Sequence, residues 1–226
     1  QPYPLVDAGS LRVGIIGLST LSTPLTTNPA NLERFLFIDY AAALNEFVPK
    51  MRSEGAQLVI LIAHICPEEL ITLSKKVGDL NIPFMGGGHC HTPYSGQTGN
   101  TVVQVGGADM AGYAYTRLSV KKTNGNITIN DFGLRKNTGG DADSDIAALL
   151  QKWQVKTDAE LNREIGYLQN KIPEGSPEMQ VLITESWLVG YPNADIALTN
   201  PGGLRDDLPA GKLTLAHIVS MLHFDN

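Results

Sequence analysis

Residues 58–64 of the chain read LVILIAH, an uninterrupted apolar run that ends in a histidine. A continuous apolar run of this length is typical of a strand buried on both faces of a sheet. Apolar residues at helical spacing precede it over 40–52, and Pro67 opens a second helical segment after it. A short strand, 82–85, then runs into three glycines. This alternation of strands and helices predicts a layered α/β fold.

The pattern changes in the second half of the chain, where strands follow one another and a long helix comes next. The Asn-Gly pair at 124–125 favours a hairpin. Trp153, on the long helix, and Trp187 are interpreted as core residues. The expected ranges are strands at 101–105, 113–120, 126–132 and 194–200, and helices at 146–164, 176–189 and 213–222.

Composition limits the classes of function. The chain has 226 residues, 42% hydrophobic residues and a formal net charge of −6. An acidic chain argues against nucleic acid or an anionic membrane as partner, because both need a basic face. No apolar run approaches the roughly 20 residues that span a bilayer, so no membrane span is expected. Gln1 resembles a mature or cut end rather than a translation start, and Asn126-Ile127-Thr128 is a glycosylation sequon.

Three of the five histidines follow apolar strands: His64 after the first run, and His89 and His91 after the second. Ligands gather at the carboxyl ends of strands in α/β sheets. Neutral imidazole is a good ligand for zinc, manganese or iron, and the glycines at 86–88 allow a sharp turn. These histidines therefore indicate a metal site, although a histidine after a strand can also be structural or lie at the surface.

Several motifs together resemble the 5′-nucleotidase family, whose members join a calcineurin-like metallophosphoesterase domain to a C-terminal nucleotide-binding domain. The matching stretches, in family order, are IAH at 62–64, GGGHCHT at 86–92, VVQVGG at 102–107, TNPGGLR at 199–205, PAGKLT at 209–214 and HFDN at 223–226. The resemblance covers nearly the whole chain.

The resemblance implies a function and a set of site residues. Two divalent metal ions, zinc, manganese or similar, would activate a water that attacks the phosphorus of a nucleotide. His64 and His89 would bind one ion and His91 the other. The substrate-binding residues implied are Asn200, Gly202, Gly203, Arg205 and Phe224, with Phe224 stacking on the base. The implied location is extracellular or periplasmic.

The resemblance also implies how the chain is divided. Residues 1–138 would be the C-terminal part of a layered metallophosphoesterase sandwich, and 139–165 a linker helix. Residues 166–226 would be the first part of an α+β nucleotide-binding domain. The implied substrate is a nucleoside 5′-monophosphate or a related nucleotide.

Some family motifs are absent from the sequence. The upstream Asp-x-His, Gly-Asp-x-x-Asp and Gly-Asn-His-(Asp/Glu) motifs, which carry the bridging carboxylate and the catalytic histidine, do not occur, and His223 and Asp225 replace a proline and a glycine. We therefore expect a fragment that holds one metal ion or none by itself, with the missing N- and C-terminal segments as possible separate chains. Two alternatives stay open: a non-catalytic nucleotide, metal or protein-binding module, and a single-metal hydrolase with Glu68 or Glu69 as base.

The two cysteines, Cys66 and Cys90, are too few for a disulfide-rich scaffold. If His64 and His89 share an ion, as the resemblance implies, the cysteines lie on adjacent loops and a disulfide becomes sterically possible. The alternative is two unrelated buried thiols.

Overall fold

A computed structural model describes residues 2–121 and 123–223. The chain divides into two compact units, unit 1 from Gln1 to Gly139 and unit 2 from Gly140 to Asn226. The long helix that follows this boundary, α4 (Ser144–Leu161), belongs to unit 2. The two units together form a mixed α/β fold.

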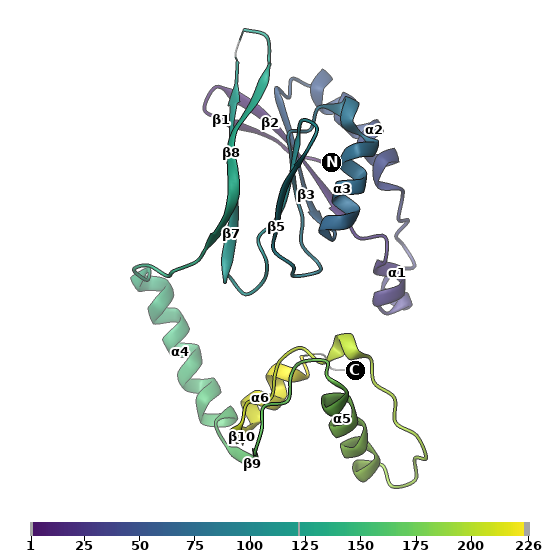
Figure 1. The fold of residues 1–226 in the computed structure, drawn as a ribbon, viewed down its shortest axis with the longest axis vertical. Coiled ribbons are helices and arrows are strands. Elements are labelled where there is room, and N and C mark those ends of the chain that lie inside the picture. The colour runs from purple at the N-terminus through teal and green to yellow at the C-terminus, as the bar shows by residue number, and fades with distance from the viewer. Residues whose placement is uncertain (1, 122, 224–226) are drawn as a thin grey trace. The chain divides into compact units, whose positions relative to one another are not determined.

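Unit 1 is built on one six-stranded sheet and one two-stranded ribbon (Figure 1). In the large sheet, β2, β3, β4 and β6 are parallel, and β1 and β5 are antiparallel edge strands. The elements are β1 (Leu5–Ala8), β2 (Leu11–Ser19), α1 (Thr23–Thr26), η1 (Pro29–Asn31), α2 (Tyr40–Ser53), β3 (Leu58–His64), α3 (Pro67–Lys76), η2 (Gly78–Leu80), β4 (Phe84–Gly86), β5 (Tyr94–Thr98), β6 (Thr101–Val105), β7 (Gly112–Val120) and β8 (Ile127–Lys136).

The core of unit 1 lies between the sheet and the helices α2 and α3, which cover one side of it (Figure 1). Leu61 and Met85 from the strands and Leu44 and Leu70 from the helices are fully buried there. The apolar run at 58–64 thus forms a central strand, but the expected burial on both faces is incomplete, because Ile62 is 54% exposed.

The β7–β8 ribbon is attached to the other side of the sheet through one buried amide. The Gln104 side chain, on β6, donates to Ser95 Oγ at 2.8 Å and to the Gly133 carbonyl at 3.0 Å. Its Oε1 accepts from Thr116 Oγ1 at 2.6 Å. The amide nitrogen and the amide oxygen of the buried Gln104 side chain are therefore both hydrogen-bonded, and these bonds connect β6 to the ribbon.

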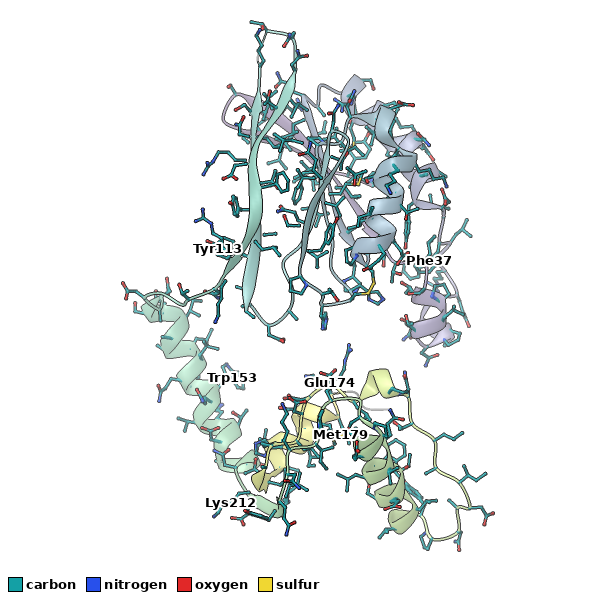
Figure 2. The ribbon with its side chains drawn as sticks, in the orientation of Figure 1. Phe37, Tyr113, Trp153, Glu174, Met179 and Lys212 are labelled. Atoms are coloured by element: carbon teal, nitrogen blue, oxygen red, sulfur yellow. A yellow bond between two sulfur atoms is a disulfide. The ribbon has the colours of Figure 1, made fainter. Side chains whose placement is uncertain are left out.

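Unit 2 is smaller and has its own apolar core. It contains α4, β9 (Glu164–Leu168), α5 (Pro177–Gly190), η3 (Pro201–Gly203), β10 (Gly211–Thr214) and α6 (Leu215–Met221). Strands β9 and β10 pair antiparallel. The core residues are Met179, Ile183, Leu204, Leu208, Leu213 and Met221, and Figure 2 labels Met179 on α5.

Two expectations for this unit are wrong. Residues 194–200 form no strand, and Ile196 and Leu198 are 74% and 84% exposed. No described strand pairs with this segment, and a β-favouring composition does not form a strand without a partner strand. Trp153 is 57% exposed on α4, which buries none of its residues (Figure 2). The apolar residues of α4 are spaced along one face of the helix, but that face packs against no core among the described residues.

Replacement of Asp39 tests how α2 begins. The Asp39 side chain accepts from the Ala42 N–H at 3.0 Å and lies near Lys76. The hydrogen bond from Ala42 is the main reason that the Asp39 pKa is lowered, and Lys76 adds to it. A lowered pKa means that the stabilisation is present above the unfolded-state pKa and is lost as the pH falls through the folded-state pKa.

We therefore expect Asp39→Ala to lower the melting temperature more at pH 7 than at a pH below both pKa values, where the protonated side chain still caps the helix but carries no charge. Asp39→Asn, which can still cap the helix, is the control and should retain more of the stability. Thermal unfolding followed by circular dichroism across pH measures both. An equal loss at acid and neutral pH would contradict the contribution of the ionised carboxylate.

Candidate functional site

His64 and His89 meet at the carboxyl-terminal edge of the parallel strands. His64 is the last residue of β3, and His89 follows β4 after two glycines. His89 Nδ1 lies 3.2 Å from His64 Nε2, and the ring centroids are 4.9 Å apart in an edge-on arrangement. In this state one nitrogen donates to the other, and the direction depends on the tautomer.

A close approach of two backbone segments produces this meeting. The Gly88 N–H donates to the Ile65 carbonyl at 3.1 Å. A Cβ atom added at Gly87 would lie 2.7 Å from the Ile65 carbonyl oxygen and would also collide with Leu70. Glycine is thus required at 87 for packing between the segments after β3 and β4, whereas the sequence suggested only a sharp turn near an ion.

A disulfide joins the same two segments. Cys66 and Cys90 are bonded, with Cα atoms 5.2 Å apart. Each cysteine is one or two residues from a histidine of the pair, since Cys66 follows His64 by two positions and Cys90 is next to His89. The covalent link therefore restricts the separation of the two imidazoles.

His91 lies in the same loop but is not brought into a cluster with the other two histidines. His89 and His91 both have positive φ angles, 71° and 55°, a conformation uncommon for residues other than glycine and often found at functional sites. Across residues 2–121 and 123–223, no group of three or more His, Cys, Asp or Glu side chains is placed to hold a metal ion. The described chain thus offers a pair of nitrogen ligands.

In unit 2, Asn200 organises the loop that the sequence singled out. Its side-chain oxygen accepts from the Gly202 N–H at 2.9 Å, and its carbonyl accepts from the Gly203 N–H at 2.9 Å. The Arg205 N–H donates to the Met221 carbonyl at 2.9 Å, which ties the loop to the end of α6. Phe224, the expected stacking residue, lies outside the described residues.

A pocket of about 620 Å³ opens beside this loop. Asn200 and Gly203 form one side, and Trp187 and Tyr191 from the end of α5 contribute aromatic surface. Trp187 is 37% exposed and Tyr191 is 72% exposed. The sequence reasoning placed Trp187 in a core and overlooked Tyr191. Trp187 lies within α5 and Tyr191 directly follows it. Helical spacing alone does not show whether such a residue packs in a core or lines a pocket.

Comparison with known proteins identifies the C-terminal part of the chain. Residues 147–226 match the family described as "5'-nucleotidase, C-terminal domain". This C-terminal part is therefore similar to the C-terminal domain of 5′-nucleotidases. The loop at Asn200 and the pocket beside it lie within the matched region.

Relatives with known names are similar over the whole chain. The bovine 5′-nucleotidase is 23% identical over 99% of this chain and 45% of its own length. The Bacillus subtilis endonuclease YhcR is also 23% identical, over 99% of this chain and 20% of its own length. The relatives thus include proteins named for different phosphoester substrates.

The fold of the whole chain is similar to that of a solved 5′-nucleotidase precursor from Thermus thermophilus. The TM-score is 0.83 at 22% identity, and the match covers 100% of this chain and 49% of the other. The chain therefore spans about half or less of the length of these three proteins. Among the described helices, none combines the length and apolar character needed to cross a bilayer.

Removal of the disulfide tests its contribution to the stability of the protein. The bond closes a loop with a sequence separation of 24, and a link of this size stabilises a protein by about 3 kcal/mol in the chain-entropy account. We expect the double variant Cys66→Ala, Cys90→Ala to lose roughly that free energy of unfolding in urea titrations.

Reductant provides the control for this prediction. It should destabilise the natural sequence toward the level of the double variant and leave the double variant unchanged. Equal stability of the oxidised, reduced and double-variant proteins would show that the link contributes nothing.

Proposed function

We propose that the chain forms part of a metal-dependent phosphoesterase that hydrolyses the phosphate ester of nucleoside 5′-monophosphates or related nucleotides. The observation that carries the proposal is the His64–His89 pair at the strand edge, in a chain whose residues 147–226 match the C-terminal domain of 5′-nucleotidases. On this account unit 1 is the C-terminal part of a layered metallophosphoesterase domain. Unit 2 is part of the nucleotide-binding domain.

The geometry of the histidine pair fits two ligands of one ion. Two imidazole nitrogens on one tetrahedral zinc ion lie about 3.3 Å apart, given Zn–N bonds of about 2.0–2.1 Å. The separation between His89 Nδ1 and His64 Nε2 is 3.2 Å. The two nitrogens are therefore already at the separation that one ion requires, and binding requires that both lack a proton and direct their lone pairs at the ion.

The pair supplies only part of a coordination shell. A zinc site that performs catalysis has three protein ligands and an open position, and the described residues include no third ligand in place. His91, two residues after His89, would serve a neighbouring ion. Carboxylate ligands and a general acid or base would come from other polypeptide.

The metal ions supply the chemistry when bound, by lowering the pKa of a coordinated water and neutralising charge on the phosphoryl oxygens. His64 and His89 would fix the position of an ion relative to β3 and β4. The disulfide between Cys66 and Cys90 would hold the two imidazoles at the separation that one ion requires.

The nucleoside would bind in unit 2, at the pocket beside Asn200. The Asn200 oxygen is engaged by Gly202, so its amide nitrogen is the group that could donate to a base or ribose. Trp187 and Tyr191 offer π surfaces against which a base could pack. Arg205, which follows the loop, carries the charge suited to a phosphate or a ribose hydroxyl, and Phe224 would stack on the base.

An extracellular or periplasmic location completes the proposal. A disulfide persists in oxidising compartments and is rare in the cytosol, and Cys66–Cys90 is of this kind. The competing function is a binding module that retains metal or nucleotide sites without turnover. Phosphate release separates the two.

Phosphate release from AMP by the protein isolated from its natural source is the test of hydrolysis. We expect release in the presence of Mn²⁺ or Zn²⁺ and its loss after treatment with a chelator. Nucleotide binding measured by calorimetry without any release would contradict hydrolysis and support the binding module.

Zinc titration of the chain tests the histidine pair without reference to activity. We expect His64→Ala and His89→Ala each to weaken the site by at least about tenfold, because even the loss of an indirect partner costs 10–100-fold. His217→Gln, which changes a helix-capping histidine of unit 2, is the matched control. Unchanged zinc affinity in both site variants would remove the basis of the proposal.

The nucleoside pocket is tested by replacing each tryptophan of unit 2 with alanine in turn. Loss of one stacking contact costs about 1–3 kcal/mol per base, so Trp187→Ala should weaken adenosine binding by roughly tenfold. Trp153→Ala, which removes the exposed tryptophan of α4, is the control and should not change it. Equal affinities for both variants would exclude Trp187 from the nucleoside site.

A further inference from the structure

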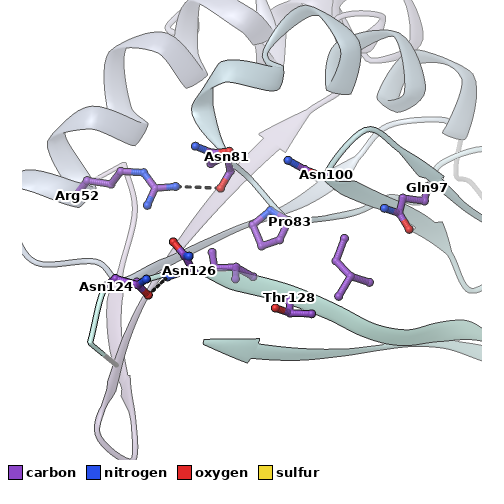
Figure 3. A pocket seen from close by; sticks show the side chains of 11 residues that line it. Arg52, Asn81, Pro83, Gln97, Asn100, Asn124, Asn126 and Thr128 are labelled. Carbon is purple, nitrogen blue, oxygen red and sulfur yellow. Dashed lines mark hydrogen bonds between the residues drawn. The ribbon is translucent and has the colours of Figure 1, made fainter. Parts of the chain in front are cut away.

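A second pocket lies in unit 1, at the amino-terminal edge of the parallel strands. Its volume is about 650 Å³. The lining residues are Arg52, Asn81, Pro83, Gln97, Asn100, Asn124, Gly125, Asn126, Ile127, Thr128 and Ile129. They come from the end of α2, the segment before β4, the β5–β6 turn and the tip of the β7–β8 ribbon (Figure 3). The histidine pair follows β3 and β4, so the two sites are at opposite strand ends.

Arg52 supplies the only formal charge among the described residues that line the pocket. Its Nη2 donates to the carbonyls of Leu80 and Asn81, at 3.0 and 2.9 Å. The side chain is partly buried, and this burial lowers its pKa below the ordinary value. Within the described ranges, no carboxylate lies at ion-pair distance from it. Arginine keeps its charge in proteins, so the pocket holds a guanidinium for which the described residues supply no counter-ion.

Five residues with side-chain amides line the same pocket as Arg52. Gln97 donates to the Gly99 carbonyl and Asn124 accepts from the Asn126 N–H. The amide groups of Asn81, Asn100 and Asn126 form no hydrogen bond with any other described residue. Figure 3 shows Arg52 and Asn81 together, with Asn126 opposite them on the ribbon. Each free amide offers both a carbonyl acceptor and an NH₂ donor.

The rest of the lining narrows the class of ligand. Among the described residues, no Asp or Glu lines the pocket, although the chain has 23 of them. A cation therefore has no partner there, whereas an anion meets Arg52. No aromatic side chain lines it either, so it lacks the stacking surface that a nucleobase uses. Hydroxyl groups, which donate and accept, are the natural complement of side-chain amides.

We infer that this pocket binds a small polyhydroxylated compound that carries one oxyanion, such as a sugar phosphate or a sugar acid. Its oxyanion contacts Arg52, and its hydroxyl groups contact Asn81, Asn100 and Asn126. The site is independent of the histidine pair and of the nucleoside pocket, because it shares no residue with either.

The test uses the full chain and two probes, glucose 6-phosphate and glucuronate. Binding is followed in ¹⁵N–¹H spectra, where the side-chain NH₂ signals report on the asparagines directly. Glucose and inorganic phosphate are the controls for the separate contributions of hydroxyl groups and charge. We expect both probes to shift the Asn100 and Asn126 signals, and each to bind at least about tenfold more tightly than glucose or phosphate, since a charge-assisted bond contributes about 1.5–3 kcal/mol.

Four variants within the pocket and one outside it localise the binding. Arg52→Gln should reduce affinity for both probes by at least about tenfold, and Arg52→Lys should restore part of it. Asn100→Ala and Asn126→Ala, which remove side chains without intramolecular bonds, should each reduce affinity several-fold and leave the fold intact. Arg117→Gln, on β7 and outside the pocket, should have no effect.

Three outcomes would overturn the inference. The first is full affinity in Arg52→Gln together with Asn100→Ala. The second is phosphate binding as tightly as glucose 6-phosphate, which would reduce the site to a simple anion site. The third is the absence of any shift with either probe.

Discussion

The proposed metal site depends on the close approach of the two backbone segments that follow β3 and β4. The Gly88 N–H to Ile65 carbonyl bond, the absence of a side chain at Gly87 and the disulfide all act on this one contact. Their common effect is to place His64 and His89 with ring nitrogens 3.2 Å apart. Two imidazoles held at this distance before any ion binds are a preorganised pair, and preorganisation reduces the ordering cost of binding.

The buried parallel strands explain why that contact can be maintained. Leu61 of β3 and Met85 of β4 are fully buried in the core. The two strands pair in parallel, so the segments that follow them leave the sheet at the same edge. The opposite edge receives different segments and therefore a different chemistry, with Arg52 and asparagines in place of histidines. Each unit has its own core. The proposed metal site and the proposed nucleoside site therefore lie in different units, each with its own core.

Sequence patterns predicted the elements that bury apolar faces. The apolar run before His64 and the helical spacing over 40–52 correspond to β3 and α2. The short strands β5, β9 and β10 were missed because few of their residues are buried, which leaves little periodicity to detect. The segment 194–200 looked like a strand but has exposed apolar side chains. The Arg52 pocket was also missed, because it forms from segments far apart in the chain, and no local motif marks such a place.

X-ray absorption spectroscopy of the chain loaded with one equivalent of Zn²⁺ tests the central claim most directly, since it reports the ligands rather than the activity. The account predicts a first shell containing two imidazole nitrogens at about 2.0–2.1 Å, completed by oxygen ligands. It also predicts that the imidazole scattering is lost in the double variant of His64 and His89. A zinc ion surrounded by oxygen ligands alone, or an imidazole signal that persists in that variant, would contradict it.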